Sequence, residues 1–285
     1  MKQSSTTVQE IIKEAKRGKM FILVDNKDRE NEGDLVIPAS KINAKKINFM
    51  AKHGRGLICL ALTQEKVKKL KLPLMSLINK SRTQTAFTVS IEAKKGISTG
   101  ISAYDRAKTI KVAIKKSSGS RDIVSPGHVF PLVSKNGGVL ERAGHTEASV
   151  DISKLAKLNP SAVICEVMNE DGTMARYNDL VPFSKKHNLK IAKIEDLISY
   201  RLKNEKFIKM ISNRKINIKR FGNYDLKVFK NKLDGSEHYA VTSKNFSYRK
   251  SPRVRVISTN IINTIFNFKN NIFKSNLNYL SKFNN

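Results

Sequence analysis

The order of apolar and polar positions predicts alternating strands and helices over the first 200 residues. Short apolar runs rich in β-branched residues are separated by stretches with helical spacing, a pattern typical of a layered α/β or α+β domain. The predicted strands are residues 20–25, 56–63, 87–93, 129–133, 162–168 and 189–194. The predicted helices are residues 7–16, 43–53, 64–72, 102–115, a segment from about 145, 178–187 and 195–206. The segment 116–127 is rich in Ser, Gly and Pro, which predicts a mobile loop.

The pattern changes after about Asn204, where acidic residues nearly vanish and Asn and Lys interrupt short apolar pieces. This change predicts a domain boundary, with one domain over residues 1–204 and a small second region over 205–285. The last thirty residues contain no acidic side chain, and they are compatible with either a packed helix or a poorly ordered segment.

The formal net charge of +30 is spread unevenly, because residues 201–285 carry 19 Lys and Arg against 4 Asp and Glu. A basic C-terminal region that binds nucleic acid is one interpretation. The favoured interpretation is a compositional drift, since the same segment is equally rich in Asn and since phosphate recognition favours Arg over Lys. Nucleic acid is therefore not expected as a partner, and attraction of an anionic substrate is a secondary effect.

The two cysteines, Cys59 and Cys165, lie in apolar strand-like runs, which predicts buried thiols in a reducing cytoplasm and no disulfide framework. No apolar run is long enough to cross a membrane. The first residues predict the start of a helix and lack the apolar segment of a signal peptide.

The most acidic segment of the chain is Asp28-Arg29-Glu30-Asn31-Glu32-Gly33-Asp34, which directly follows the predicted strand at residues 20–25. Four carboxylates on a loop at the end of a buried strand suit a hard divalent cation such as Mg²⁺, and the guanidinium between them suits an anion. A solvated acidic turn with Arg29 as its internal counter-ion is an equally good interpretation of the spacing.

A second segment with chemical potential is Arg142-Ala143-Gly144-His145-Thr146, just before a predicted helix. Backbone N–H groups at a helix start, a hydroxyl and a guanidinium together suit a phosphate, and His145 suits metal ligation or proton transfer. The plainer alternative is a helix start capped by Thr146.

Two further residues are acid/base candidates. His128 begins a strand after a loop, where a histidine is also commonly a structural hydrogen-bonding residue. Glu166 interrupts the apolar run at residues 162–168, and burial there would raise its pKa into the range useful for proton transfer. The alternative for Glu166 is the solvent face of an edge strand.

These motifs, in this order, resemble the 3,4-dihydroxy-2-butanone 4-phosphate synthase family over roughly residues 6–202. The resemblance rests on VDNKDRENEGDLVIPAS, GLICLALT, FTVSIEA, GISTGISAYDRAKTI, PGHVFPL, RAGHTEASVDI and AVICEVMNEDGTMAR. It implies an α+β fold, a layered α/β sandwich of that family's type, followed by a small degenerate C-terminal region.

The resemblance implies a role for each matching position. Glu30 and His145 would ligate Mg²⁺ or Mn²⁺, and His128 and Glu166 would be needed for turnover. The residues implied to contact substrate are Arg29, Glu30, Asp34, Arg142, Ala143, Gly144, His145, Thr146 and Glu166.

The implied activity is a magnesium-dependent lyase reaction of riboflavin biosynthesis. It converts D-ribulose 5-phosphate to 3,4-dihydroxy-2-butanone 4-phosphate and formate. Removal of a proton next to the carbonyl, loss of water and a skeletal rearrangement precede departure of C4, so the site must stabilise an enediolate and supply several acid/base groups. The family is homodimeric with sites near the subunit interface, so a homodimer is expected.

Residues 216–242 and 252–259 resemble the opening strands of GTP cyclohydrolase II, an enzyme that is fused to the synthase in many bacteria. That enzyme needs a zinc site of three closely spaced cysteines, and residues 205–285 contain none. The region is therefore predicted to be a truncated, degenerate remnant. A bifunctional protein with residual cyclohydrolase activity is the alternative.

Overall fold

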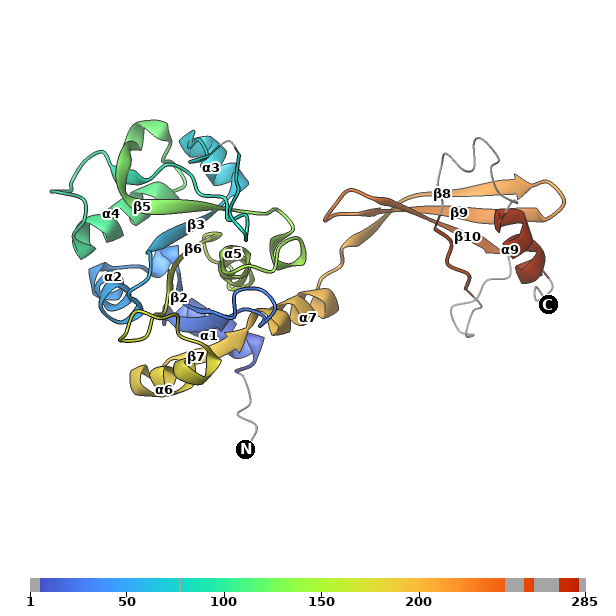
Figure 1. Cartoon of the computed structure of the whole chain (residues 1–285). Coiled ribbons are helices and arrows are strands. Elements are labelled where there is room, and N and C mark those ends of the chain that lie inside the picture. Colours follow the sequence, from blue (N-terminus) through green and yellow to red (C-terminus); the bar gives the residue numbers. More distant parts are fainter. Residues whose placement is uncertain (1–5, 77, 244–253, 259–271, 282–285) are drawn as a thin grey trace. The chain divides into compact units, whose positions relative to one another are not determined.

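The structure is a computed structural model that describes residues 6–76, 78–243, 254–258 and 272–281. The chain divides into two compact units, Met1–Glu205 and Lys206–Asn285, which are described separately (Figure 1). Among the described residues, no helix is both long and apolar enough to cross a membrane.

The N-terminal unit is built on a mixed seven-stranded sheet. β1 is antiparallel to β2 and parallel to β7, β6 lies antiparallel between β2 and β3, and β3 is parallel to β5. In order across the sheet, the strands are β4 (Ile91–Ala93), β5 (Ile123–Ser134), β3 (Cys59–Thr63), β6 (Ser161–Glu166), β2 (Gly33–Pro38), β1 (Phe21–Val24) and β7 (Lys190–Lys193).

Helices cover both faces of this sheet, so the unit is a three-layer sandwich. One apolar cluster joins α1 (Val8–Arg17), α5 (His145–Leu155) and α7 (Ile194–Asn204) to one face. The other cluster joins the opposite face to α2 (Ala44–Phe49), α3 (Gln64–Leu70), α4 (Ala103–Ile114) and α6 (Tyr177–His187). Side chains alternate between the two faces of a sheet, so neighbouring residues of one strand pack into different clusters, as Ile22 and Leu23 of β1 do. The predicted layered α/β sandwich is confirmed.

Polar caps explain where several helices begin. Thr7 accepts the N–H of Glu10, and the Glu10 carboxylate accepts the N–H of Thr7 in return, which forms a capping box at α1. Asn43 and Ser102 cap α2 and α4 with the side chain alone, which accepts the N–H of Lys46 and of Asp105 respectively. The helix predicted from Asn43 to residue 53 continues past α2 as a π-helical turn over Met50–Gly54.

Two predicted segments are wrong in their extent. The strand expected at residues 87–93 is regular only over Ile91–Ala93, because Thr88 and Val89 donate to the carbonyls of Pro131 and Pro73 on two different neighbours. The loop expected at residues 116–127 contains a 3₁₀ turn, Ser120–Asp122, and the first part of β5. β5 begins early because Ile123 pairs with Ala93.

The C-terminal unit contains a three-stranded antiparallel sheet in the order β10 (Glu237–Ser243), β9 (Gly222–Asn231), β8 (Ile208–Ile218), and a helix, α9 (Ile272–Ser281). The strand expected at residues 252–259 lies partly outside the described residues. Its described part, 254–258, has no regular structure.

A buried ion pair joins two helices of the N-terminal unit. Arg201 on α7 donates from Nη1 to Asp151 Oδ2 at 2.7 Å and to the Gly137 carbonyl at 2.9 Å. Only 8% of Arg201 and 3% of Asp151 is exposed to solvent. Removing one partner of such a pair leaves the other charge buried, which is more costly than removing both.

We predict that Arg201→Met lowers the free energy of unfolding of the N-terminal unit by about 3 kcal/mol. Adding Asp151→Leu should recover more than half of this loss, because the unpaired carboxylate is then absent. Urea unfolding of the two variants and the wild type measures both values. A loss below about 1 kcal/mol in the single variant would contradict the prediction.

Candidate active site

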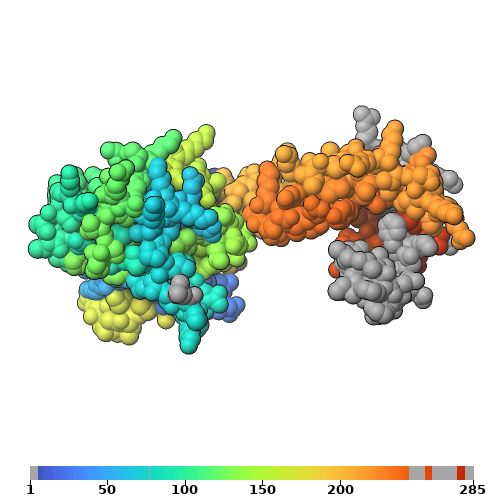
Figure 2. All heavy atoms as spheres, turned by 90° about the horizontal axis from the view of Figure 1, so that it is seen from above, coloured from blue at the N-terminus to red at the C-terminus, as the bar shows by residue number. Residues whose placement is uncertain are grey.

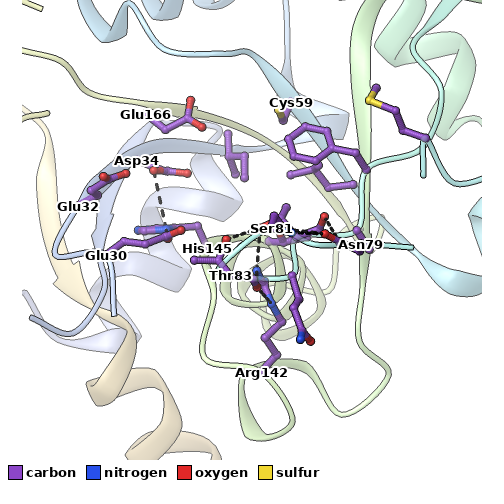
Figure 3. Close-up of a pocket in the computed structure, with 18 of the residues that line it drawn as sticks. Glu30, Glu32, Asp34, Cys59, Asn79, Ser81, Thr83, Arg142, His145 and Glu166 are labelled. Carbon is purple, nitrogen blue, oxygen red and sulfur yellow. Dashed lines mark hydrogen bonds and ion pairs between the residues drawn. The ribbon is translucent and has the colours of Figure 1, made fainter. Parts of the chain in front are cut away.

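A pocket of about 590 Å³ opens where β1 ends, β2 begins and β6 ends, beside the start of α5 (Figure 3). Elements far apart in sequence contribute to it, and its volume is typical of a small-molecule site. Its lining residues are Arg29, Glu30, Glu32, Asp34, Cys59, Leu74, Met75, Ser76, Asn79, Ser81, Thr83, Gln84, Thr85, Ala86, Phe87, Leu132, Arg142, His145, Thr146, Ile164 and Glu166.

The acidic loop is organised from inside by Asp25, whose side chain is fully buried. Its carboxylate accepts the backbone N–H of Glu32 at 2.8 Å and that of Glu30 at 3.2 Å. It also accepts from Arg29 Nη1 at 2.8 Å, and the same nitrogen contacts the carboxylate of Glu30. Arg29 is therefore the internal counter-ion that one interpretation expected, but only Asp28 of the four acidic residues is exposed.

Asp34 and Glu166 are forced together by the register of the sheet. They are directly paired residues of β2 and β6, so their side chains share one face. Burial and the neighbouring Glu166 carboxylate raise the pKa of Asp34 well above its usual value. Burial also raises the pKa of Glu166, although the N–H of Leu57 donates to its Oε2 at 2.8 Å.

Glu166 is not on an edge strand, because β6 lies between β2 and β3. Its carboxylate needs the adjacent glycine, since a Cβ on Gly56 would lie 2.6 Å from Glu166 Oε2 and 2.6 Å from its carbonyl oxygen. Glu166 is half-buried, at the end of an otherwise buried central strand, and it lines the pocket.

His145 is the first residue of α5 and is 6% exposed. Its Nδ1 lies 3.8 Å from Asp34 Oδ1 and 4.0 Å from Glu30 Oε2, and Figure 3 shows the three side chains facing one another. Its Nε2 is buried and has no hydrogen-bond partner among the described residues. Burial lowers the pKa of His145, which favours the neutral imidazole that ligates metals.

The donor set fits a divalent cation. Ligand atoms of Asp25, Glu30 and His145 all lie within 4.8 Å of one another. Both oxygens of Asp25 already accept hydrogen bonds from the loop, so Asp25 orders the loop while Glu30 and His145 keep an atom directed at the pocket. Two observations favour a metal here. His145 Nε2 is buried without a hydrogen-bond partner among the described residues, and Nδ1 of the same ring lies beside the carboxylates of Glu30 and Asp34.

The other end of the pocket is basic and polar. Arg142 donates to Glu147 Oε2 at 2.6 Å, to Thr85 Oγ1 at 2.9 Å and to the Thr83 carbonyl at 3.0 Å. In Figure 3, Arg142 and Thr83 lie on the side of the pocket away from Glu166. The pocket therefore has an acidic end and a cationic end.

The start of α5 is open to an anion. Gly144 is the N-cap and no side chain caps the first turn, so Thr146 is not the capping residue that the plainer alternative required. Thr146 instead lines the pocket. A Cβ on Gly144 would lie 2.3 Å from Arg142 Nη1, so this glycine lets the guanidinium approach the helix start.

The structure brings most but not all of the predicted site residues together. Arg29, Glu30, Asp34, Arg142, His145, Thr146 and Glu166 line the pocket. Ala143 and Gly144 do not line it, although both precede α5 directly. His128 is exposed, lies outside the lining and contacts the Glu92 carboxylate.

Sequence reasoning missed one wall of the pocket. The segment between α3 and β4 contributes Ser76, Asn79, Ser81, Thr83 and Thr85 to the lining. The first three are exposed and the two threonines are half-buried. Figure 2 shows atoms of this part of the chain, in cyan, on the surface of the unit. A polar run between two apolar segments was the available signal, but its spacing resembles that of an ordinary loop. Cys59 also lines the pocket, and burial raises its pKa, which keeps it a thiol as predicted.

Comparisons with known proteins agree with this geometry. Residues 9–200 match the family model of 3,4-dihydroxy-2-butanone 4-phosphate synthase. The chain is 49% identical to the synthase of Photobacterium phosphoreum, covering 88% of this chain and 69% of that protein. It is 50% identical to the riboflavin biosynthesis protein RibBA of Aquifex aeolicus, covering 91% and 64%.

Solved structures of 3,4-dihydroxy-2-butanone 4-phosphate synthases are also similar to this chain. RibBX, a two-domain 3,4-dihydroxy-2-butanone 4-phosphate synthase from A. baumannii, is similar with a TM-score of 0.76 and 46% identity, covering 84% of this chain and 70% of that one. A synthase in complex with two magnesium ions has a TM-score of 0.67 and 36% identity, covering 70% and 98%. The chain spans about two thirds of the length of the first two relatives. It belongs to the 3,4-dihydroxy-2-butanone 4-phosphate synthase family.

Proposed function

We propose that this chain converts D-ribulose 5-phosphate to 3,4-dihydroxy-2-butanone 4-phosphate and formate in riboflavin biosynthesis. The observation that carries the proposal is the pocket in which Glu30, Asp34, His145 and Glu166 converge from three segments of the chain. Its acidic end suits a metal-bound carbonyl and hydroxyls, and its cationic end suits a phosphate. A phosphorylated sugar of five carbons fits both ends.

Glu30 and His145 would hold a divalent cation, Mg²⁺ or Mn²⁺. A bound cation supplies charge stabilisation to an enediolate. The pocket favours a cation, because the carboxylates of Glu30, Glu32, Asp34 and Glu166 all line it.

The acid/base roles follow from position and burial. Asp34 and Glu166 lie side by side, and burial raises the pKa of each carboxylate, which favours the protonated form that can deliver a proton and take it back. Arg142, Thr146 and the first N–H groups of α5 would bind the phosphate, with Ala143 and Gly144 shaping that turn. Arg29 is the remaining cation of the acidic loop and would hold the sugar beside Asp34.

We further propose a homodimer, which would give His128 a role. Within one subunit His128 is four residues along β5 from Leu132 of the pocket, a separation of about 13 Å in a strand. Its side chain is exposed and held by Glu92, as a group presented to another surface would be. In a dimer it would complete the pocket of the partner subunit.

Residues 205–285 are proposed to lack GTP cyclohydrolase activity, because the only cysteines are Cys59 and Cys165 and zinc ligation of the expected type is absent from this region. Bifunctionality and nucleic-acid binding remain the alternatives for this basic region.

A cytoplasmic location is proposed from the two free, buried thiols.

We predict that the wild-type chain releases formate from ribulose 5-phosphate when Mg²⁺ is present and stops when the metal is chelated. Glu30→Ala and His145→Ala should each reduce kcat at least 100-fold, because each removes a metal ligand. Glu65→Ala, at an exposed carboxylate on α3, is the control and should keep wild-type turnover. A wild-type chain that is inactive with both Mg²⁺ and Mn²⁺ would disprove the proposed function.

Glu166→Gln should reduce turnover at least 100-fold. Without metal, the same change should raise the free energy of unfolding by about 1 kcal/mol, as replacing an active-site group that is unfavourable for stability often does. The sign follows from the pKa of Glu166, which burial raises in the folded state, so ionisation above the unfolded value of about 4.3 destabilises the wild type. The advantage of the variant should therefore shrink as the pH falls toward that value. Thermal unfolding in EDTA from pH 4 to pH 8 measures this, and a variant less stable than the wild type at pH 7 would contradict it.

Mixed dimers test the role of His128. Glu30→Ala and His128→Ala homodimers should both be inactive, and co-refolded mixtures should regain about a quarter of the wild-type rate, since half of the dimers are mixed and have one intact pocket. Formate release from the mixture measures this recovery. If His128 acts within its own subunit, no mixed dimer has a complete pocket, and the absence of any recovered rate would contradict the proposal. A Glu30→Ala/His128→Ala double variant mixed with wild type is the matched control. Its heterodimers have no complete pocket if the partner supplies His128, and one complete pocket if His128 acts within its own subunit.

A further inference from the structure

An arginine outside the pocket holds the backbone of the acidic loop from its outer side. Arg176 Nη1 donates to the carbonyl of Glu30 at 2.6 Å and to the carbonyl of Asn31 at 2.9 Å. Its guanidinium also lies 3.7 Å from the Glu32 carboxylate. Hydrogen bonds of a charged donor to carbonyl oxygens are stronger than neutral ones.

These bonds act on the peptide groups on either side of the predicted metal ligand. Asp25 accepts the N–H of Glu30 from inside the loop, while Arg176 binds the carbonyl of Glu30 from outside. Asn31 adopts a left-handed conformation with φ of 56°, and Arg176 binds its carbonyl as well. With both peptide groups held, the Cα–Cβ bond of Glu30 has a set direction, from which its carboxylate reaches to within 4.0 Å of His145 Nδ1.

Arg176 reaches the loop from a segment that also positions Glu166. Beyond Glu166, the chain continues in a hairpin in which Ala175 donates to the Val167 carbonyl. Val167 donates to the carbonyl of Gly33, at the start of β2. The hairpin is therefore attached to the sheet beside Asp34, and it carries Glu166 at one end and Arg176 at the other.

The contact is not a requirement of helix α6. Arg176 is the N-cap of that helix through its backbone, whose N–H donates to Asp179 Oδ2 at 2.9 Å. Its side chain is 45% exposed, and an exposed ion pair such as that with Glu32 contributes little stability. The side chain can thus be replaced without removing the helix cap, and what is lost is the pair of bonds to the loop.

We propose that Arg176 is a positioning residue for divalent-cation binding, which acts by holding the Glu30–Asn31 backbone so that Glu30 and His145 converge. The inference rests on the proposed function for the identity of the site but concerns metal binding rather than turnover. It adds Arg176 to the residues on which the site depends, although Arg176 does not touch the pocket.

Direct Mn²⁺ binding, measured by electron paramagnetic resonance of the full chain without substrate, tests the proposal. Arg176→Ala should bind Mn²⁺ about 10-fold more weakly than the wild type, which is the usual effect of removing a group that orients a ligand. The Mn²⁺ affinity of Arg176→Lys should lie between those of the wild type and Arg176→Ala, because the ammonium of lysine keeps the charge but lacks the planar fork of the guanidinium. Arg17→Ala, which removes a surface arginine paired with Glu14, is the control and should bind as the wild type does.

Hydrogen exchange without metal gives a second readout that a general loss of stability would not reproduce. The amides of Glu30 and Glu32 should exchange about 10-fold faster in Arg176→Ala, while amides of β3 keep their rates. Mn²⁺ affinity within twofold of the wild type, or faster exchange throughout the sheet together with weaker binding, would overturn the proposal. If the wild type binds Mn²⁺ but releases no formate, the proposed function fails while this inference is still decided by the Mn²⁺ titration.

Discussion

The buried carboxylate of Asp25 is the group on which the arrangement of the acidic loop depends. It sits immediately after β1 and accepts two backbone N–H groups and a guanidinium of the same loop. An unpaired charge at this depth would be strongly unfavourable, so the loop must wrap around it to supply donors. The turn between β1 and β2 is thereby given one conformation, and Glu30 is carried to a defined place.

The sheet imposes a second constraint, which opposes stability. Pairing of β2 with β6 sets Asp34 against Glu166, and neither carboxylate has an arginine or lysine as a hydrogen-bond partner among the contacts found in the described chain. The N–H of Leu57 donates to Glu166, and burial lowers the pKa of His145, which disfavours a positive charge on its ring. The fold thus places carboxylates together where a cation would relieve their repulsion, an arrangement that is typical of functional sites.

Much of this architecture follows from the sequence because its signals are local. Thr7, Asn43 and Ser102 begin helices by capping them, and apolar runs of strand length form the sheet. The acidic run and the segment around His145 were also identifiable, since each is an unusual local composition beside a predicted element. Resemblance to the family supplied the link between them, which spacing alone does not give.

What the sequence could not supply depends on contacts between distant segments. Arg176 ends one of the segments that carry the family resemblance, but no local signal connects it with the acidic loop. The hairpin after β6 brings it to the carbonyls of Glu30 and Asn31. The strand at residues 87–93 is shortened for a similar reason, since its neighbours at Pro73 and Pro131 lie on separate segments.

The two kinds of constraint have a common origin. β6 continues past Glu166 into the hairpin that ends at Arg176, so the strand that brings the carboxylates together also supplies the cation that orders their loop. Shifting β6 by one residue would turn Glu166 to the opposite face of the sheet and displace Arg176 from the loop at the same time. The register of β2 with β6 therefore sets both the electrostatic cost of the site and the means of shaping it.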